Sequence, residues 1–192
     1  MADPLRERTA RLLTDFLEYC ARAPGSPARA PSTPEAEVLR YVATQVQQSH
    51  QQFLSNFRGY RQNRVALVGR LERYLLPDPQ NVSWGYIAAL LIFAGTLLER
   101  PPPGNDLTLK PDQEQDLEWE TNVDQDCQRL VALLCDRLME RHRAWLEAHN
   151  GWDGFCLFFS PLLPYSWKTL LVQALLSCVT VMILIYLLRR LS

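Results

Sequence analysis

The sequence predicts an all-α protein, a helical bundle around one central hydrophobic helix, followed by a C-terminal transmembrane helix. Several segments repeat apolar residues at the spacing of an amphipathic helix, and no segment shows the alternation of a β-strand. The internal segment 84–98 carries no charged residue, as a helix enclosed by others does. The segment 169–188 is uncharged and long enough to cross about 30 Å of hydrocarbon.

The composition excludes several functional classes. The 192 residues suffice for one domain and a tail, and 47% of them are hydrophobic. A formal net charge of -1 gives no electrostatic basis for nucleic-acid binding. The five cysteines are odd in number and form no C-x-x-C pair, which favours free thiols in a reducing compartment. No signal-peptide pattern opens the chain.

Residues 1–22 predict an amphipathic first helix. Its apolar stripe consists of Leu5, Leu12, Leu13, Phe16, Leu17 and Cys20. A proline-rich linker over 23–34 follows it. Ser32 or Thr33 can cap the next helix, with Pro34 in its first turn.

Two more amphipathic helices are predicted before Pro77. The apolar stripe of the first consists of Val38, Leu39, Val42, Val46, Phe53 and Phe57. Gly59 and Asn63 separate the two helices. The apolar stripe of the second consists of Leu67, Val68, Leu71, Tyr74 and Leu75.

Ser83 is a good N-cap for the central helix at 84–98, which is too short to cross a membrane comfortably. We expect a loop over 99–120, because proline opens it and acidic residues follow. A helix from about Val123 towards Trp145 is expected next. Asn150-Gly151 ends it, and a short apolar helix at 152–159 follows.

The last part of the chain predicts a tail anchor. A linker at 161–168 leads into the apolar segment 169–188, which Lys168 precedes and Arg189 and Arg190 follow. The apolar side chains outweigh the one Gln173 on membrane-insertion scales. Because little chain follows the segment, we expect insertion after translation, with the preceding domain on the cytosolic side. The alternative is a buried core helix, which a terminal segment rarely finds enough protein to cover.

Catalytic and metal-binding patterns are missing from the sequence, which predicts neither an enzyme nor a cofactor. It contains no H-E-x-x-H, no phosphate-binding glycine loop and no G-x-S-x-G motif. His142, His149 and Cys156 could be imagined as zinc ligands, but their seven-residue steps cross a helix break. We therefore expect His142 and His149 to be satisfied surface side chains, and His50 lies far from both in the sequence.

Two tryptophan-containing segments resemble motifs of the Bcl-2 family. The sequence SWGYI at 83–87 resembles the first homology motif (BH1), which would span 80–99. The sequence NGWDGF at 150–155 resembles the second motif (BH2), which would span 149–160.

The order of the other segments agrees with the same family. Residues 1–22 resemble the fourth motif (BH4), and 38–50 occupies the place of the third (BH3). The order, the spacing and the tail agree over nearly the whole chain. The resemblance therefore implies a Bcl-2-like core at 35–160.

This resemblance implies an apoptosis regulator. Such proteins bind the amphipathic BH3 helix of pro-apoptotic relatives, such as Bax, Bak or Bim, in a hydrophobic surface groove. The implied role is anti-apoptotic, at the mitochondrial outer membrane or the endoplasmic reticulum, with homo- or heterodimers possible. The alternatives are a pro-apoptotic or membrane-permeabilising member, or a generic tail-anchored adaptor without a groove.

The resemblance also singles out site residues. The implied groove residues are Trp84, Gly85, Tyr86, Phe57, Val68, Leu71 and Leu91. Core packing is equally expected for the last four. Gly151, Trp152 and Asp153 are expected to have structural roles, Asp153 as a charge at a helix N-terminus.

The chain departs from the family pattern at two places. Tyr86 stands where the family has an arginine, which pairs with an aspartate of the bound helix. A neutral hydroxyl replaces that charged fork, so we expect weaker or altered partner selectivity. Ala43-Thr44 replaces the Gly-Asp pair of the third motif, which makes this segment a poor death ligand itself.

Overall fold

The computed structural model describes residues 3–22, 26–27, 29–78, 82–100 and 113–160, without the side chains of 113–120. Every regular element in these ranges is helical, which confirms the all-α prediction. The predicted linker at 161–168 and tail at 169–188 lie outside the described residues. Among the helices that are described, none is long and apolar enough to cross a membrane.

The first two helices begin at side-chain caps. Helix α1 (Pro4–Ala21) starts where the Asp3 carboxylate accepts a hydrogen bond from the Arg6 amide, at 3.3 Å. Helix α2 (Pro34–Ser49) starts where the Thr33 hydroxyl accepts one from the Ala36 amide, also at 3.3 Å. Proline occupies the first turn of both helices, where a missing amide hydrogen costs nothing.

The apolar stripe that ends at Phe57 does not belong to one helix, which corrects the prediction. The backbone leaves the helical region at His50, with φ -124° and ψ 28°. A short α3 (Gln51–Leu54) and a 3₁₀ turn, η1 (Ser55–Phe57), follow. The bend directs the apolar side chains towards the central helix, where the ring centroids of Phe57 and Phe93 are 5.1 Å apart.

Helices α4 (Arg64–Leu75) and α5 (Trp84–Leu98) form the next pair. Asn63 caps α4, and the Ser83 hydroxyl caps α5 by accepting from the Tyr86 amide at 3.2 Å. Every α5 residue except Tyr86 is buried. The bundle therefore has the central apolar helix that its sequence predicts.

Helix α6 (Gln113–Arg141) begins inside the segment 99–120, which was wrongly predicted as a loop. The acidic residues there open a helix, because negative charge is favourable at a helix N-terminus. Two short helices follow, α7 (Arg143–Ala148) and α8 (Gly151–Phe159). The chain leaves the helical region at His142 and again at Asn150, whose φ is 60°.

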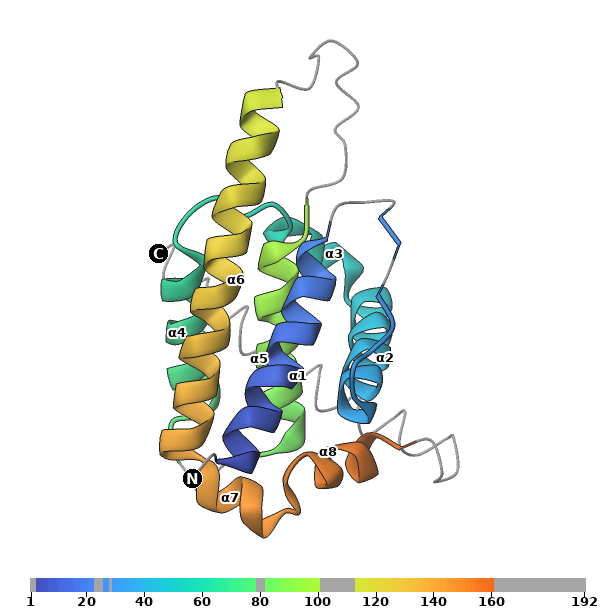
Figure 1. Cartoon of the computed structure of the whole chain (residues 1–192), viewed down its shortest axis with the longest axis vertical. Coiled ribbons are helices and arrows are strands. Elements are labelled where there is room, and N and C mark those ends of the chain that lie inside the picture. The colour runs from blue at the N-terminus through green and yellow to red at the C-terminus, as the bar shows by residue number, and fades with distance from the viewer. Residues whose placement is uncertain (1–2, 23–25, 28, 79–81, 101–112, 161–192) are drawn as a thin grey trace.

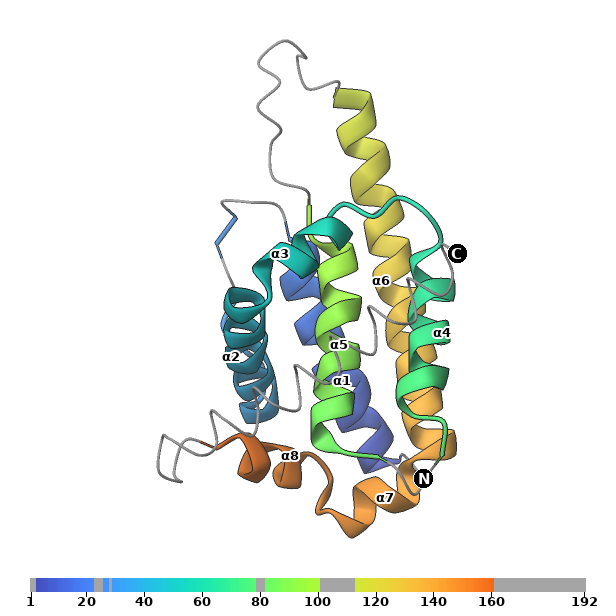
Figure 2. The same cartoon turned by 180° about the vertical axis from the view of Figure 1, so that it is seen from behind.

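Helices α1, α2, α4 and α6 all pack against α5. Helices α1 and α6 pack side by side over one face of α5, α2 flanks the opposite edge from α4, and α7 and α8 close one end (Figure 1, Figure 2). His142 is buried in this packing, and neither of its ring nitrogens has a hydrogen-bond partner among the described residues. The expectation of a surface histidine is therefore wrong for His142.

Candidate functional site

The two tryptophan segments meet at one end of the bundle. We call residues 83–87 the first box and residues 150–155 the second box. The ring centroids of Trp84 and Trp152 are 5.8 Å apart. Trp145 and Phe155 lie at 4.8 and 5.7 Å from Trp84. Both tryptophans are buried, so each holds helix ends together.

The second box is fastened to α1. The indole nitrogen of Trp152 donates to the Thr9 hydroxyl at 2.8 Å. That hydroxyl donates in turn to the carbonyl of Leu5, at 2.8 Å. A buried indole N–H needs such a partner, and the BH4-like helix supplies it.

Charges reinforce the same contact. The Arg8 guanidinium binds the Asp153 carboxylate at 2.7 and 3.0 Å and the Glu35 carboxylate at 2.6 and 3.2 Å. Glu35 is 1% exposed, so this arginine neutralises a buried charge. The triad ties α1, α2 and α8 together.

These contacts shift the pKa values of the triad. Hydrogen bonding to Arg8 lowers the pKa of Asp153 below its usual range. Hydrogen bonding to Asp153 and then to Glu35 raises the pKa of Arg8. Asp153 also lies in the first turn of α8, where a negative charge is favourable.

The backbone of the second box needs its glycines. Gly151 has a φ of +53°, a region that side chains other than glycine rarely adopt. A Cβ atom on Gly154 would overlap the carbonyl oxygen of His149. Small residues here let the chain turn tightly between α7 and α8.

Tyr86 occupies a different environment in the first box. Its ring is half-buried against the core, and it is the α5 residue that keeps solvent exposure. Its hydroxyl forms no hydrogen bond within the described part of the chain. An incoming polar group could therefore use this hydroxyl without displacing an internal partner.

Most of the other predicted groove residues are buried in the core, and one is half-buried. Val68, Leu71 and Leu91 lie inside the hydrophobic core, and Gly85 is buried as well. Phe57 is half-buried, with its ring 5.2 Å from that of Phe53. Of this set, only Phe57 and Tyr86 keep exposed surface.

Sequence reasoning missed the partners of the second box. Arg8, Thr9 and Glu35 contact it across the fold, and Arg8 and Asp153 are separated by 145 residues in the chain. In the sequence, Arg8 is explained by its place on the solvated face of an amphipathic helix. Glu35 is explained as a favourable negative charge at a helix N-terminus. Only the tertiary structure pairs them.

The described residues offer little for catalysis. They hold no group of three or more His, Cys, Asp or Glu side chains that could bind a metal. Burial raises the pKa of the Cys127 thiol to about 12 and that of Cys20 well above its usual value. Such thiols stay protonated and unreactive. The arrangement suits a binding protein.

Comparison with known sequences decides the family. The family described as "Apoptosis regulator proteins, Bcl-2 family" matches residues 39–152. The chain belongs to the Bcl-2 family. It is therefore an apoptosis regulator without enzymatic activity, as its sequence predicts.

Three segments, at 3–9, 93–100 and 151–156, look particularly like Bcl-B (Bcl-2-like protein 10), and this expectation is confirmed. Human Bcl-2-like protein 10 is 52% identical over 193 residues, covering 100% of this chain and 95% of that protein. The anti-apoptotic protein NR13 of Coturnix japonica is 31% identical, covering 83% of this chain and 80% of that protein.

Solved structures show the same fold. The solution structure of a divergent Bcl-2 protein matches with a TM-score of 0.66 and 45% identity, covering 85% of this chain and 94% of that one. The zebrafish pro-survival protein NRZ in complex with a Bad BH3 segment matches with a TM-score of 0.60 and 23% identity. That match covers 81% of this chain and 94% of that one.

Proposed function

We propose that this Bcl-2 family member is anti-apoptotic and binds the BH3 helices of pro-apoptotic relatives in a hydrophobic groove. The observation that carries the proposal is the environment of Tyr86, half-buried beside the core with an unpartnered hydroxyl. The partner is an amphipathic helix with apolar anchors at i, i+3 or i+4, and i+7. Bax, Bak and the BH3-only protein Bim are the candidates.

Two relatives support this role. NR13, which is 31% identical to this chain, is named anti-apoptotic. NRZ, which shares the fold, is named pro-survival and forms a complex with a Bad BH3 segment. We infer the same activity for this chain.

Apolar anchoring sets the affinity in this proposal. Each buried anchor of the partner contributes about 1.5–3 kcal/mol, and four contribute about 6–12 kcal/mol. The loss of translational, rotational and side-chain freedom costs a similar amount. Charged contacts tune the choice between partners in the family pattern. Tyr86 removes the cation that this pattern offers to the partner's aspartate, so in this chain the choice depends more on the partner's apolar anchors.

Attachment of α1 favours survival activity over pore formation. For α5 to enter a bilayer, the bundle would first have to release α1, which Trp152, Asp153 and Glu35 hold. The main competitor is a membrane-permeabilising protein. Release of a dye from liposomes by the pure protein is the measurement that separates the two roles.

We also propose that the apolar segment 169–188 anchors the chain in the mitochondrial outer membrane or the endoplasmic reticulum. The helical domain then faces the cytosol, where its partners are. A fluorescent fusion lacking residues 169–192 would lose membrane localisation, whereas localisation that survives this deletion would contradict the anchor.

The central experiment measures binding of Bim and Bax BH3 peptides to the full chain in detergent micelles, with Tyr86→Arg in parallel. We expect saturable binding to at least one peptide. The arginine variant should bind about tenfold more tightly, because a charge-assisted hydrogen bond contributes about 1.5–3 kcal/mol.

Tyr41→Arg is the matched control. Tyr41 lies on α2 with 55% of its surface exposed, so the same substitution there adds a charge without changing the core. The control should bind as the original chain does. Equal gains from both substitutions would show non-specific attraction, and no binding by any form would reject the proposed groove.

A further inference from the structure

A second polar surface lies where α1 and α5 end. It is a cleft of about 270 Å³ between the C-terminal ends of α1 and α5 and the middle of α2. We call it the arginine cleft. Its lining residues are Tyr19, Cys20, Arg22, Arg40, Ala43, Thr44, Gln47, Arg58, Glu99 and Arg100. None of the predicted groove residues lines it, so it is distinct from the groove proposed above.

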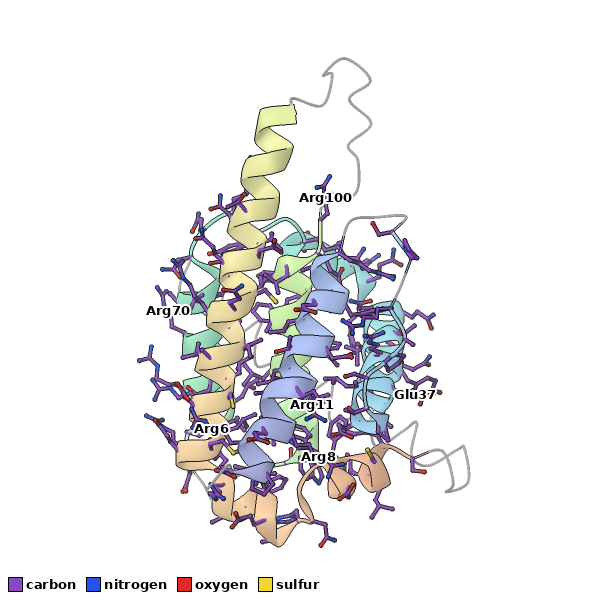
Figure 3. All side chains as sticks on the ribbon, viewed as in Figure 1. Arg6, Arg8, Arg11, Glu37, Arg70 and Arg100 are labelled. Atoms are coloured by element: carbon purple, nitrogen blue, oxygen red, sulfur yellow. The ribbon has the colours of Figure 1, made fainter. Side chains whose placement is uncertain are left out.

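The charges of the arginine cleft are unbalanced. Four guanidinium groups line it, against the one carboxylate of Glu99. That carboxylate is already bound by Arg58 at 2.7 Å and accepts a hydrogen bond from Gln47. Arg100 lies at the end of the bundle where α5 stops (Figure 3). Arg40 is bound in turn by Asp15 at 2.6 Å, which leaves Arg22 as a lining arginine without an ion pair among the described residues.

Arg40 retains an unused donor. Its terminal nitrogens bind the Asp15 carboxylate at 2.6 Å and the Arg29 carbonyl at 2.7 Å. Its Nε is buried and has no hydrogen-bond partner in the described part of the chain. The side chain is only 11% exposed, and a buried donor without a partner is costly.

Arg22 retains its whole charge. It is exposed at the end of α1 and forms no ion pair with any described residue. Its guanidinium carbon lies 4.5 Å from the centroid of the Tyr19 ring, and that of Arg40 lies 4.2 Å from the same centroid. The ring thereby holds two guanidinium groups beside the cleft.

We propose that the arginine cleft binds a small anion carrying two or more phosphate groups. Arg22 supplies an exposed charge with no ion pair among the described residues, and three further arginines line the cleft beside it. Guanidinium groups bind phosphate oxygens through paired hydrogen bonds. The volume is below the roughly 300–1,000 Å³ of pockets for drug-sized ligands, which suits a compact anion.

A purely structural explanation makes the opposite prediction. The C-terminal ends of α1 and α5 carry partial negative charge, about half an elementary charge each, which arginines can neutralise. If that were the only role of the cleft, it would not bind phosphate anions. Binding therefore separates the two explanations.

The test is titration of inorganic tripolyphosphate into the full chain in neutral detergent micelles, followed by calorimetry. We expect saturable binding with one site. Arg22→Gln should weaken it about tenfold, because it removes one charge-assisted contact. Arg22→Lys, which keeps the charge, should weaken it less.

Arg70→Gln is the matched control. Arg70 lies on α4, away from the end of α5 that carries Arg100 (Figure 3), and it lines no part of the cleft. Removing its charge should leave the affinity unchanged. No saturable binding, or equal losses from Arg22→Gln and Arg70→Gln, would overturn the proposal. Because Arg22 is exposed, the variant should fold, and its circular dichroism spectrum checks this.

A second experiment distinguishes a lipid headgroup from a free anion as the natural source of the phosphate groups. The full chain is placed in nanodiscs of neutral lipid, with or without a lipid whose headgroup carries a phosphorylated inositol. If the natural anion is a lipid headgroup, the phosphorylated lipid should reduce tripolyphosphate binding to the original chain. If the natural anion is free in solution, tripolyphosphate binding should be the same in both nanodiscs. Failure of BH3-peptide binding would leave both outcomes unaffected, so the two proposals can fail independently.

Discussion

The two tryptophan boxes have the same environment at their tryptophans and a different one at the polar residue that follows. In both, the tryptophan is buried and joins the same aromatic cluster at one end of the bundle. In the second box, the next residue, Asp153, is bound by Arg8 of the same chain. In the first box, the residue two places after the tryptophan, Tyr86, keeps exposed surface and a free hydroxyl.

This difference separates structure from recognition. The polar residue of the second box is used internally, so its substitution affects the stability of the fold and not a partner-binding contact. The polar residue of the first box has no internal partner, so its substitution changes what the surface can bind. A sequence motif alone does not distinguish these cases, because both boxes have a tryptophan, a glycine and a polar neighbour.

Trp152→Ala gives the largest expected effect on the second box. The substitution empties a fully buried aromatic site and leaves the Thr9 hydroxyl without its donor. We expect a loss of about 3–5 kcal/mol in the free energy of unfolding. Urea titration followed by circular dichroism measures it. Trp152→Phe keeps most of the ring and should lose less stability. Equal losses of stability from the alanine and phenylalanine variants would contradict this account.

Gly154→Ala gives the next largest effect. The added methyl group would overlap the His149 carbonyl oxygen, so the turn between α7 and α8 must open. We expect the free energy of unfolding to fall by about 1–3 kcal/mol. Gly69→Ala, on α4, is the control, because its Cβ would lie 3.7 Å from a methyl carbon of Leu133. That variant should be neutral or up to about 1 kcal/mol more stable, and similar losses in both would remove the special role of Gly154.

The pH dependence of the second box gives the smallest effect. Arg8 lowers the pKa of Asp153 in the folded state, so the pair stabilises the fold above the ordinary value near 3.8. That stability is lost as the pH falls through the lower folded pKa. Asp153→Asn should therefore reduce the acid sensitivity of the thermal unfolding midpoint. The reduction should be small, because the carboxylate is exposed. Tyr86→Phe should leave the acid sensitivity unchanged; an equal change would contradict the contrast between the boxes.

The sequence predicted much of the fold because its main signals are local. The cap at Ser83 and the uncharged run after it are sufficient to locate α5. The stripe ending at Phe57 was misread because helical spacing continues across the bend at His50. The start of α6 was missed because its acidic residues also suit a solvated loop.

The site was less predictable because its contacts join distant segments. Pairing of Arg8 with Glu35 and Asp153 depends on how three helices pack, which no local pattern encodes. The same applies to His142, whose burial comes from the packing around the α6–α7 break. The assignment of Tyr86 to partner binding stays a prediction, and the peptide measurements test it.

The contacts of α1 also bear on how the protein is made. Thr9 meets Trp152, which a ribosome adds 143 residues later. At about 5–20 residues per second, this takes roughly 7–30 s. During that time α1 cannot complete its contacts, and its apolar stripe is available to chaperones. The first helix of the nascent chain is thus among the last to reach its final place.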